Sequence, residues 1–335
     1  MKYFSDRSII KVVCVALLLT TAMASSTTPS IAAGTSSSSA GMAVSTFMNT
    51  NAAVPEELET FAKQTIGNLS GHMPFKSWQD AALKFTPLGP GTHSWLVMLE
   101  NNTKPLGYLI ITSDDAGGYM LSEYGIGSEL PYSIAPLEHS LAAASLVQAG
   151  SPGISAAHPF LPQGSKIEPL YSPMSPYFKI TVKGKAPMYI HAVTYDMLPA
   201  PTSVDTANSM GQTAEKYTVI SSSDALTPSP VTSTQGKQDP YLNLTWLTRP
   251  ALTIKSGKEI LRHLQANSRK SFVFTSEKHN AAFGAPFSLT GWQRWSEEEH
   301  AKSDIIYVSI PQRNQDLTRF VPAQILIESG TFHEE

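Results

Sequence analysis

The chain has 335 residues, with 24 Lys or Arg against 27 Asp or Glu, and its formal net charge at pH 7 is −3. This mildly acidic balance, without a basic cluster, argues against nucleic-acid binding, because cations that neutralise phosphates dominate such binding. The single cysteine, Cys14, precedes residue 25. The rest of the chain therefore has no thiol for a disulfide, a thiolate nucleophile or a zinc–thiolate site.

The N-terminus has the pattern of a bacterial secretory leader. Basic residues precede an apolar run over residues 12–22, and the small-x-small sequence Ala22-Met23-Ala24 follows as a cleavage signal. The run is shorter than the roughly 20 residues that a membrane-spanning helix needs. We therefore predict a signal peptide over residues 1–24, with cleavage near residues 31–33 as the alternative. The processed protein, with a net charge of −5, is expected to be secreted or to reach the cell-envelope space, without a stable membrane span.

The next stretches predict a tether and a first α+β module. Residues 25–54 are mainly Ser, Thr, Ala and Gly with little to bury, which favours a disordered tether. The module is predicted over residues 55–135 and begins with a helix at Pro55, where proline and an acidic first turn suit a helix N-terminus. Apolar runs around polar turns predict strands over residues 94–99, 106–111 and 119–124.

A helix-and-hairpin module is predicted over residues 136–198. Its helix, over residues 136–148, starts at a proline and is followed by Gly150. Its hairpin has strands at 177–182 and 188–193. The following residues are polar and rich in Pro, Ser, Thr and Gly, which predicts a linker or a long excursion over residues 199–237 and not a domain.

The last stretch, residues 238–335, predicts a C-terminal α+β module. Ser256-Gly257-Lys258-Glu259 has the capping-box pattern that begins a helix. Further elements are predicted as strands over residues 271–275, 287–295 and 305–310 and as a helical turn over residues 322–327.

No residue pattern in the chain is typical of a catalytic, cofactor or metal site. The histidines are scattered, without a His-Glu-x-x-His pair, and no nucleophile elbow, phosphate loop or dinucleotide fingerprint occurs. We therefore predict no catalytic residue, no metal and no cofactor. Of the tryptophans, Trp95 and Trp292 are predicted to lie in the core. Trp246 and Trp295 have polar neighbours and are predicted to lie at the surface and to bind a ligand.

Three segments of the C-terminal module share a pattern with a known family. They are Ala285-Pro286-Phe287-Ser288-Leu289-Thr290-Gly291-Trp292, Ile305-Ile306-Tyr307-Val308 and Arg319-Phe320-Val321-Pro322. Together they resemble the strand half of secreted bacterial papain-like cysteine peptidases of the bacteriocin-processing type. Residues 107–114 are similar to the propeptides of secreted bacterial cysteine peptidases.

The resemblance implies a degenerate papain-like half without the family's chemistry. Ala285 stands where the family has its catalytic histidine, and Ser309-Ile310-Pro311 stands where it has an acidic turn. No cysteine remains to serve as the nucleophile. Without a thiolate and its imidazole base, catalysis of that type cannot operate.

We therefore expect an α+β protein, built of antiparallel sheet modules with flanking helices, that is secreted and acts without catalysis. Its partner would be a peptide, a cell-wall component or another exported protein. His279 and Glu277 are predicted to bind the ligand together with the two surface tryptophans. One alternative is a hydrolase with a dispersed site, in which His279 pairs with Glu277 or His191 with Asp196. Another is a prodomain-like peptidase inhibitor built on residues 55–135.

Overall fold

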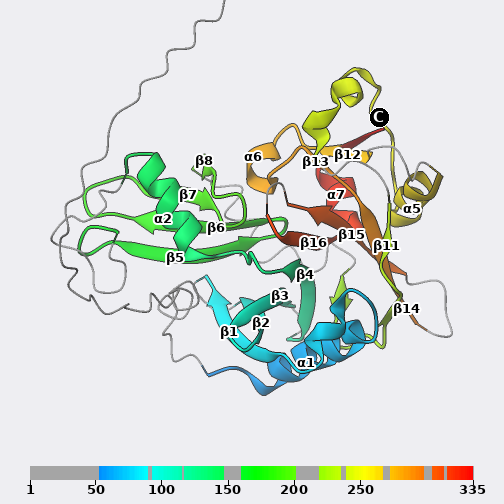
Figure 1. The fold of residues 1–335 in the computed structure, drawn as a ribbon, viewed down its shortest axis with the longest axis horizontal. Coiled ribbons are helices and arrows are strands. Elements are labelled where there is room, and N and C mark those ends of the chain that lie inside the picture. Colours follow the sequence, from blue (N-terminus) through cyan, green and yellow to red (C-terminus); the bar gives the residue numbers. More distant parts are fainter. Residues whose placement is uncertain are drawn as a thin grey trace, which may run out of the picture. The chain divides into compact units, whose positions relative to one another are not determined.

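The computed structural model describes residues 53–89, 93–114, 117–146, 160–200, 219–234, 239–266, 272–297, 304–312 and 315–334. All of them fall within one unit, Ser39–Glu335, which holds all three predicted modules. The predicted signal peptide and nearly all of the predicted tether lie outside the described residues. The predicted α+β class is confirmed, because helices occur together with antiparallel sheets (Figure 1).

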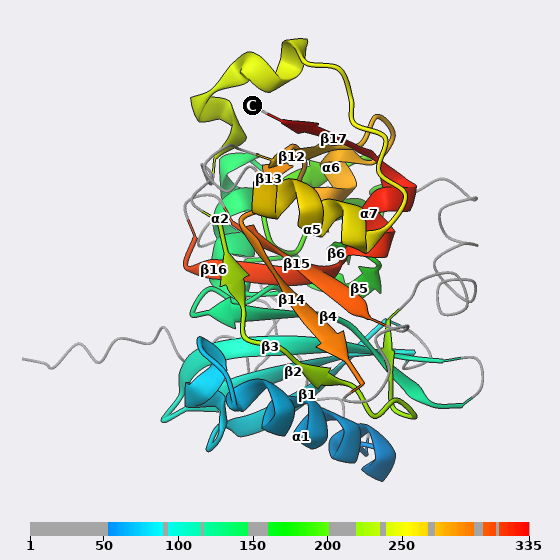
Figure 2. The same ribbon diagram turned by 90° about the vertical axis from the view of Figure 1, so that its right-hand side faces the viewer.

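A ten-stranded antiparallel sheet is the central layer (Figures 1 and 2). Its strands are β1 (Ala82–Leu88), β2 (Ser94–Asn101), β3 (Lys104–Ser113), β4 (Tyr119–Gly127), β9 (Ile220–Ser221), β10 (Thr227–Pro228), β11 (Thr232–Ser233), β14 (Gly291–Ser296), β15 (Ile305–Pro311) and β16 (Leu317–Pro322). The main order is β1-β2-β3-β4-β16-β15-β14-β10, with β9 paired to β4 and β11 paired to β14. Because β4 pairs with β16, the N-terminal meander and the C-terminal strands share one sheet across the predicted module boundaries.

Part of the stretch predicted as a linker or long excursion pairs with the central sheet. Within residues 219–234, the strands β9, β10 and β11 pair with β4 and β14, so this part of the predicted linker belongs to the central sheet. These strands have two residues each, too few to show an alternating pattern, and their partners lie far away in the sequence. Local composition therefore could not identify them.

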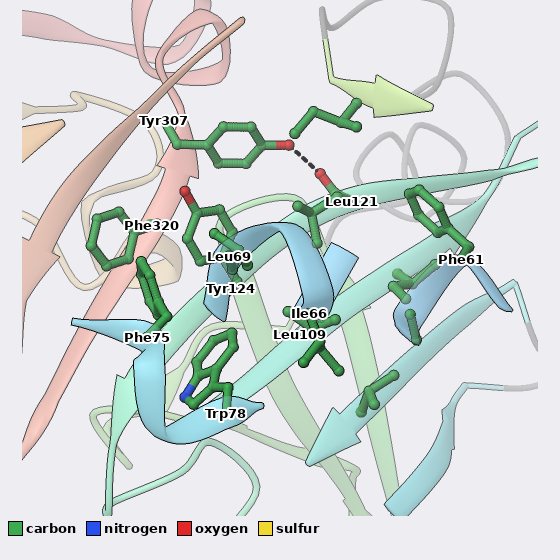
Figure 3. Close-up of a cluster of buried hydrophobic side chains, with 14 of the residues drawn as sticks. Phe61, Ile66, Leu69, Phe75, Trp78, Leu109, Leu121, Tyr124, Tyr307 and Phe320 are labelled. Atoms are coloured by element: carbon green, nitrogen blue, oxygen red, sulfur yellow. Dashed lines mark hydrogen bonds between the residues drawn. The ribbon is translucent and has the colours of Figure 1, made fainter. Parts of the chain in front are cut away.

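Helices cover one face of the central sheet. They are α1 (Glu56–Ser70) and the 3₁₀ turn η2 (Phe75–Trp78), and Figure 3 shows their apolar side chains packed against those of the strands. Tyr124 lies at the centre of this cluster: its ring stacks on Phe320 with centroids 4.9 Å apart, and its hydroxyl donates to Gln293 Oε1 at 2.6 Å. The hydroxyl of Tyr307 donates to the Leu121 carbonyl (Figure 3). Each large apolar side chain buried in this way stabilises the fold by roughly 1.5–3 kcal/mol.

Two smaller sheets with their helices cover the opposite face. Near β2 and β3 lie α2 (Ile134–Ala143) and a four-stranded sheet of β5 (Lys166–Ser172), β6 (Ser175–Thr181), β7 (Met188–His191) and β8 (Met197–Leu198). Near β15 and β16 lie α5 (Gly257–Ala266), α6 (Asn280–Phe283), α7 (Ala323–Ser329) and a three-stranded sheet of β13 (Phe287–Ser288), β12 (Phe272–Thr275) and β17 (Thr331–Glu334). Figure 2 shows α1 on one side of the central sheet and α5 and α7 on the other.

The covering of both faces of the central sheet explains the sequence of β2. Successive residues of a strand point to opposite faces, so Trp95 and Val97 enter the cluster beneath α1 while Leu96 and Met98 enter the cluster beneath the four-stranded sheet. A strand covered on both faces is apolar throughout, which accounts for the continuous run over residues 95–99.

Two predicted elements have different bounds in the structure. The strand predicted over residues 287–295 is two strands: β13 pairs with β12 in the three-stranded sheet, and β14 pairs with β15 in the central sheet. The change of sheet takes place at Leu289 and Thr290, which the local pattern of apolar and polar residues does not reveal. The helix predicted over residues 136–148 is α2, which ends at Ala143. The predicted capping box begins α5, although the Glu259 carboxylate accepts the amide of Lys255 and not that of Ser256.

Two glycines give opposite expectations for substitution by alanine. Gly107 on β3 lies so close to its neighbours that a Cβ would stand 2.4 Å from the Gly125 carbonyl oxygen and 2.4 Å from Trp78 Cζ2. Gly107→Ala should therefore destabilise the fold by about 2 kcal/mol. Gly67 lies in α1, and a Cβ added there would meet nothing within 4 Å, so Gly67→Ala should stabilise the fold by about 0.5–1 kcal/mol. Denaturant unfolding measures both changes in the free energy of unfolding. Changes of the same sign in the two variants would contradict this packing.

Candidate functional site

A buried ion pair lies between the central sheet and the four-stranded sheet. Glu123 on β4 and Arg319 on the neighbouring strand β16 are both fully buried. Arg319 Nη2 donates to Glu123 Oε2 at 2.7 Å, and Arg319 Nε donates to Oε1 at 3.3 Å. Glu123 and Tyr124 are successive residues of β4, so their side chains point to opposite faces of the sheet. Tyr124 lies in the cluster beneath α1, and the ion pair therefore faces away from that cluster.

Two tyrosines and a backbone carbonyl complete the hydrogen bonding of this pair. Tyr108 on β3 donates to Glu123 Oε1 at 2.8 Å, and Tyr171 on β5 donates to Oε2 at 3.3 Å. Arg319 Nη2 also donates to the Met174 carbonyl at 3.4 Å. Burial, followed by the charge of Glu123, raises the pKa of both tyrosines, which therefore remain protonated donors. The network ties the hairpin of β5 and β6 to the central sheet.

The network holds the charges of Glu123 and Arg319 in fixed positions and leaves them little capacity to bind or react with another group. Each oxygen of Glu123 accepts two hydrogen bonds, so the carboxylate has little capacity left for a metal or a substrate. Burial lowers the pKa of Arg319, but Glu123 and then Tyr108 raise it more, and the net shift is upward. The guanidinium is thus a permanent cation whose counter-charge is Glu123.

This network was not predicted from the sequence, although a signal existed. Glu123 and Arg319 are single charged residues of opposite sign, each within an otherwise apolar or polar-uncharged strand. Charged residues in buried strands are normally paired. Which pairs form depends on β4 lying beside β16, and that adjacency is a tertiary property.

His191 lies close to this network but lacks the predicted partner. It is buried at the end of β7, and its Nδ1 accepts the amides of Val193 at 3.1 Å and Thr194 at 3.0 Å. Nδ1 is therefore unprotonated, and the proton of the neutral ring is on Nε2. Asp196 is exposed and contacts His191 through its backbone carbonyl, which accepts the amide of His191. The predicted His191–Asp196 acid–base pair is not formed.

The surroundings of His191 keep its ring neutral. Burial, followed by the positive charge of Arg319, lowers the pKa of His191 to about 3. An opposing interaction with the backbone of Ala282 is weaker, and Nε2 has no hydrogen-bond partner within normal reach among the described residues.

The second predicted pair, His279 with Glu277, is not formed either. His279 is half-buried at the start of α6, where its ring packs on Phe283 with centroids 5.3 Å apart. Glu277 is exposed, and no hydrogen bond or ion pair joins it to His279 in the described chain. The two side chains are neighbours in sequence without forming a joint site.

The prediction that Trp246 and Trp295 lie at the surface is wrong. Trp246 is 4% exposed, and its Nε1 donates to the Pro240 carbonyl at 2.9 Å. Trp295 is 1% exposed in the cluster beneath α1 and packs edge-on against Tyr124. Polar neighbours along the chain point to other faces, while residues distant in sequence cover the rings. The predicted burial of Trp95 and Trp292 is confirmed.

An exposed apolar segment lies immediately around Trp246. Residues 240–248, here called the apolar segment, contain the 3₁₀ turns η3 (Pro240–Leu242) and η4 (Leu244–Thr248). Four of its large side chains are solvent-exposed: Tyr241 by 52%, Leu242 by 71%, Leu244 by 51% and Leu247 by 59%. In both ribbon views the segment lies at the periphery beside β17 (Figures 1 and 2).

The apolar segment is held in one conformation by its own polar groups. The side chains of Asp239 and Asn243 cap the two turns by accepting the amides of Tyr241 at 2.9 Å and Thr245 at 3.0 Å. Trp246 anchors the segment from below, with its ring 5.8 Å from that of His333 on β17. The exposed leucines are thus presented by a preorganised loop.

The described residues contain no group of three or more His, Cys, Asp or Glu side chains that could hold a metal ion. Over the same residues, no helix is both long and apolar enough to cross a bilayer. No protein-family model, curated protein or solved structure matches this chain.

Proposed function

We propose that this chain is an exported, non-catalytic binding protein that docks through the apolar segment, residues 240–248. The observation that carries the proposal is the exposure of Tyr241, Leu242, Leu244 and Leu247 on one loop of two capped 3₁₀ turns. At roughly 200 Å² for a fully exposed side chain, they present on the order of 400 Å². Exposed apolar area of this size, gathered within one short segment, often marks a functional surface on a monomer.

Preorganisation supports a binding role for the apolar segment. A flexible loop loses conformational entropy when it binds, whereas a loop already held by capping side chains loses little. Asp239, Asn243 and Trp246 restrain the backbone in this way while leaving the leucines in solvent. Trp246, which holds the loop, is buried, whereas Leu242, Leu244 and Leu247 stay exposed.

The remaining parts of the proposal rest on the sequence. Export rests on the leader pattern over residues 1–24. A non-catalytic role rests on the family resemblance, in which Ala285 replaces the histidine and no cysteine remains after the leader. The separation of His191 from the Asp196 carboxylate and of His279 from the Glu277 carboxylate is consistent with that role.

Replacement of the three leucines should abolish docking without unfolding the protein. The chain from residue 25, labelled with a fluorophore, is incubated with isolated envelopes of the producing cells. A variant with Leu242→Ser, Leu244→Ser and Leu247→Ser should bind at least tenfold less, because each serine removes exposed apolar area that binding would bury.

The matched control replaces two other exposed large apolar residues, Met73→Ser and Met197→Ser, which are 64% and 47% exposed. The control should bind like the parent, and both variants should keep the parent's unfolding midpoint. Equal binding by the parent and the leucine variant would refute docking through the apolar segment. Hydrolysis of casein or of a peptide library at an appreciable rate would refute the non-catalytic role.

A further inference from the structure

We propose that the partner of the apolar segment is the surface of a lipid bilayer, into which Leu242, Leu244 and Leu247 insert. This inference rests on the docking role proposed above and names the chemistry of the partner. Three properties of the segment carry this inference. They are the size of the exposed apolar area, the hydrogen bonds that part of its backbone already makes, and the balance of its charges.

The exposed area is small for a stable protein–protein interface. Such an interface buries about 800 Å² on each partner, whereas the apolar segment presents on the order of 400 Å². A symmetric dimer formed through the segment alone would therefore fall short of the standard size. A bilayer requires no complementary groove, and its interior accepts apolar side chains of any shape, so a small projecting patch is sufficient.

Part of the backbone of the segment is already hydrogen-bonded, which suits a medium without hydrogen-bond partners. The amides of Tyr241 and Thr245 bond to capping side chains, and the amide of Leu242 bonds to the Asp239 carbonyl. The amide of Arg249 bonds to the Trp246 carbonyl. Unpaired backbone groups are costly in a bilayer, so this pairing lowers the cost of moving the loop out of water.

The charges that flank the segment predict how lipid composition and salt affect binding. The apolar segment itself contains no charged residue, and its immediate neighbours Asp239 and Arg249 have opposite charges, so the segment has no net charge to attract anionic lipids. Tyr241 lies between the Asp239 end and the leucines, and tyrosine is a residue that favours the membrane interface. Insertion should therefore depend on apolar burial and be nearly independent of salt and of anionic lipid.

The test uses vesicle flotation with the chain from residue 25. Vesicles of phosphatidylcholine, and of phosphatidylcholine with phosphatidylglycerol, are each used at low and at high salt. The parent should float with both kinds at both salt concentrations. The triple leucine variant should bind at least tenfold less, and the variant with Met73→Ser and Met197→Ser should bind like the parent.

Insertion itself can be located by fluorescence, because the chain from residue 25 has no cysteine. Leu244→Cys, labelled with an environment-sensitive dye, should show a blue shift when vesicles are added. Met73→Cys, also exposed, should not. Unfolding midpoints of the labelled proteins establish that both remain folded.

The outcomes separate this inference from the docking proposal. Failure of the parent to float, together with envelope binding that still requires the three leucines, would overturn the bilayer inference and leave the docking proposal standing. Binding only to anionic vesicles and only at low salt would also overturn it. Leucine-dependent dimerisation in sedimentation experiments without lipid would assign the surface to a second copy. If the parent does not float with vesicles and its binding to envelopes does not depend on the leucines, both proposals are refuted.

Discussion

Glu123→Gln should lower the free energy of unfolding by about 3–5 kcal/mol. The substitution preserves the shape of the side chain but leaves Arg319 buried without its counter-charge, and an uncompensated buried ion is among the most costly defects in a protein interior. Arg319→Met should have a loss of similar size, because it leaves the Glu123 carboxylate buried without its cation. Urea unfolding of the two variants and the parent measures both losses.

The double variant distinguishes loss of a partner from loss of the pair. Glu123→Gln combined with Arg319→Met removes both charges, and it should cost clearly less than the sum of the single losses. The control is Glu59→Gln, which breaks the exposed pair with Lys63 in α1 and should cost no more than about 0.5 kcal/mol. A loss for Glu123→Gln no larger than that of the control would show that the Glu123–Arg319 pair does not hold the sheets together.

Acidification should destabilise the protein through His191. The pKa of His191 is lowered from 6.5 to about 3 in the folded protein, by burial and then by Arg319. Between these values the unfolded chain binds a proton that the folded protein does not bind, so stability falls as the pH falls below about 6.5. Over the full window the loss is about 4–5 kcal/mol, and about 3 kcal/mol of it should occur by pH 4.

His191→Gln provides the control, because glutamine does not titrate. The stability difference between pH 7 and pH 4 should be smaller in this variant than in the parent by about 3 kcal/mol. The pKa of Asp316, lowered by hydrogen bonds from Ser128, adds its own acid destabilisation only below about its usual value of 3.8. Above pH 4 the difference between the variant and the parent therefore reports on His191. An NMR titration in which the ring of His191 becomes protonated near pH 6 while the protein stays folded would contradict the prediction.

Much of the local structure could be predicted because it depends on neighbours in sequence. The hairpin of β2 and β3 follows from two apolar runs around a polar turn, and the start of α1 follows from Pro55 and its acidic first turn. The hairpin of β6 and β7 was predicted from apolar residues that alternate on either side of a turn. The edge strands β1, β5 and β17 were not predicted. Many of their side chains are only half-buried, so the apolar pattern along each strand is weak. Pairing with the neighbouring strand decides where each of them begins and ends.

The candidate surfaces were harder to predict because exposure is not a local property. Trp246 and Trp295 both have polar neighbours, yet His333 packs against the first and Tyr124 against the second. Conversely, Leu242 and Leu247 have the composition of core residues, and the fold leaves them in solvent because no element of the described chain covers the apolar segment. The sequence contained the caps of this loop, Asp239 and Asn243, without any indication of which side chains the turns would direct outward.

The sequence by itself determined the α+β class, the principal hairpins and the lack of any thiol beyond residue 14. These follow from composition, from periodicity over a few residues and from turn chemistry. Only the tertiary structure decided that β4 lies beside β16, that Glu123 therefore meets Arg319, and that three leucines remain exposed. Burial and charge pairing depend on contacts between segments far apart in the chain, and those contacts are settled by the packing of whole layers and not by any local pattern.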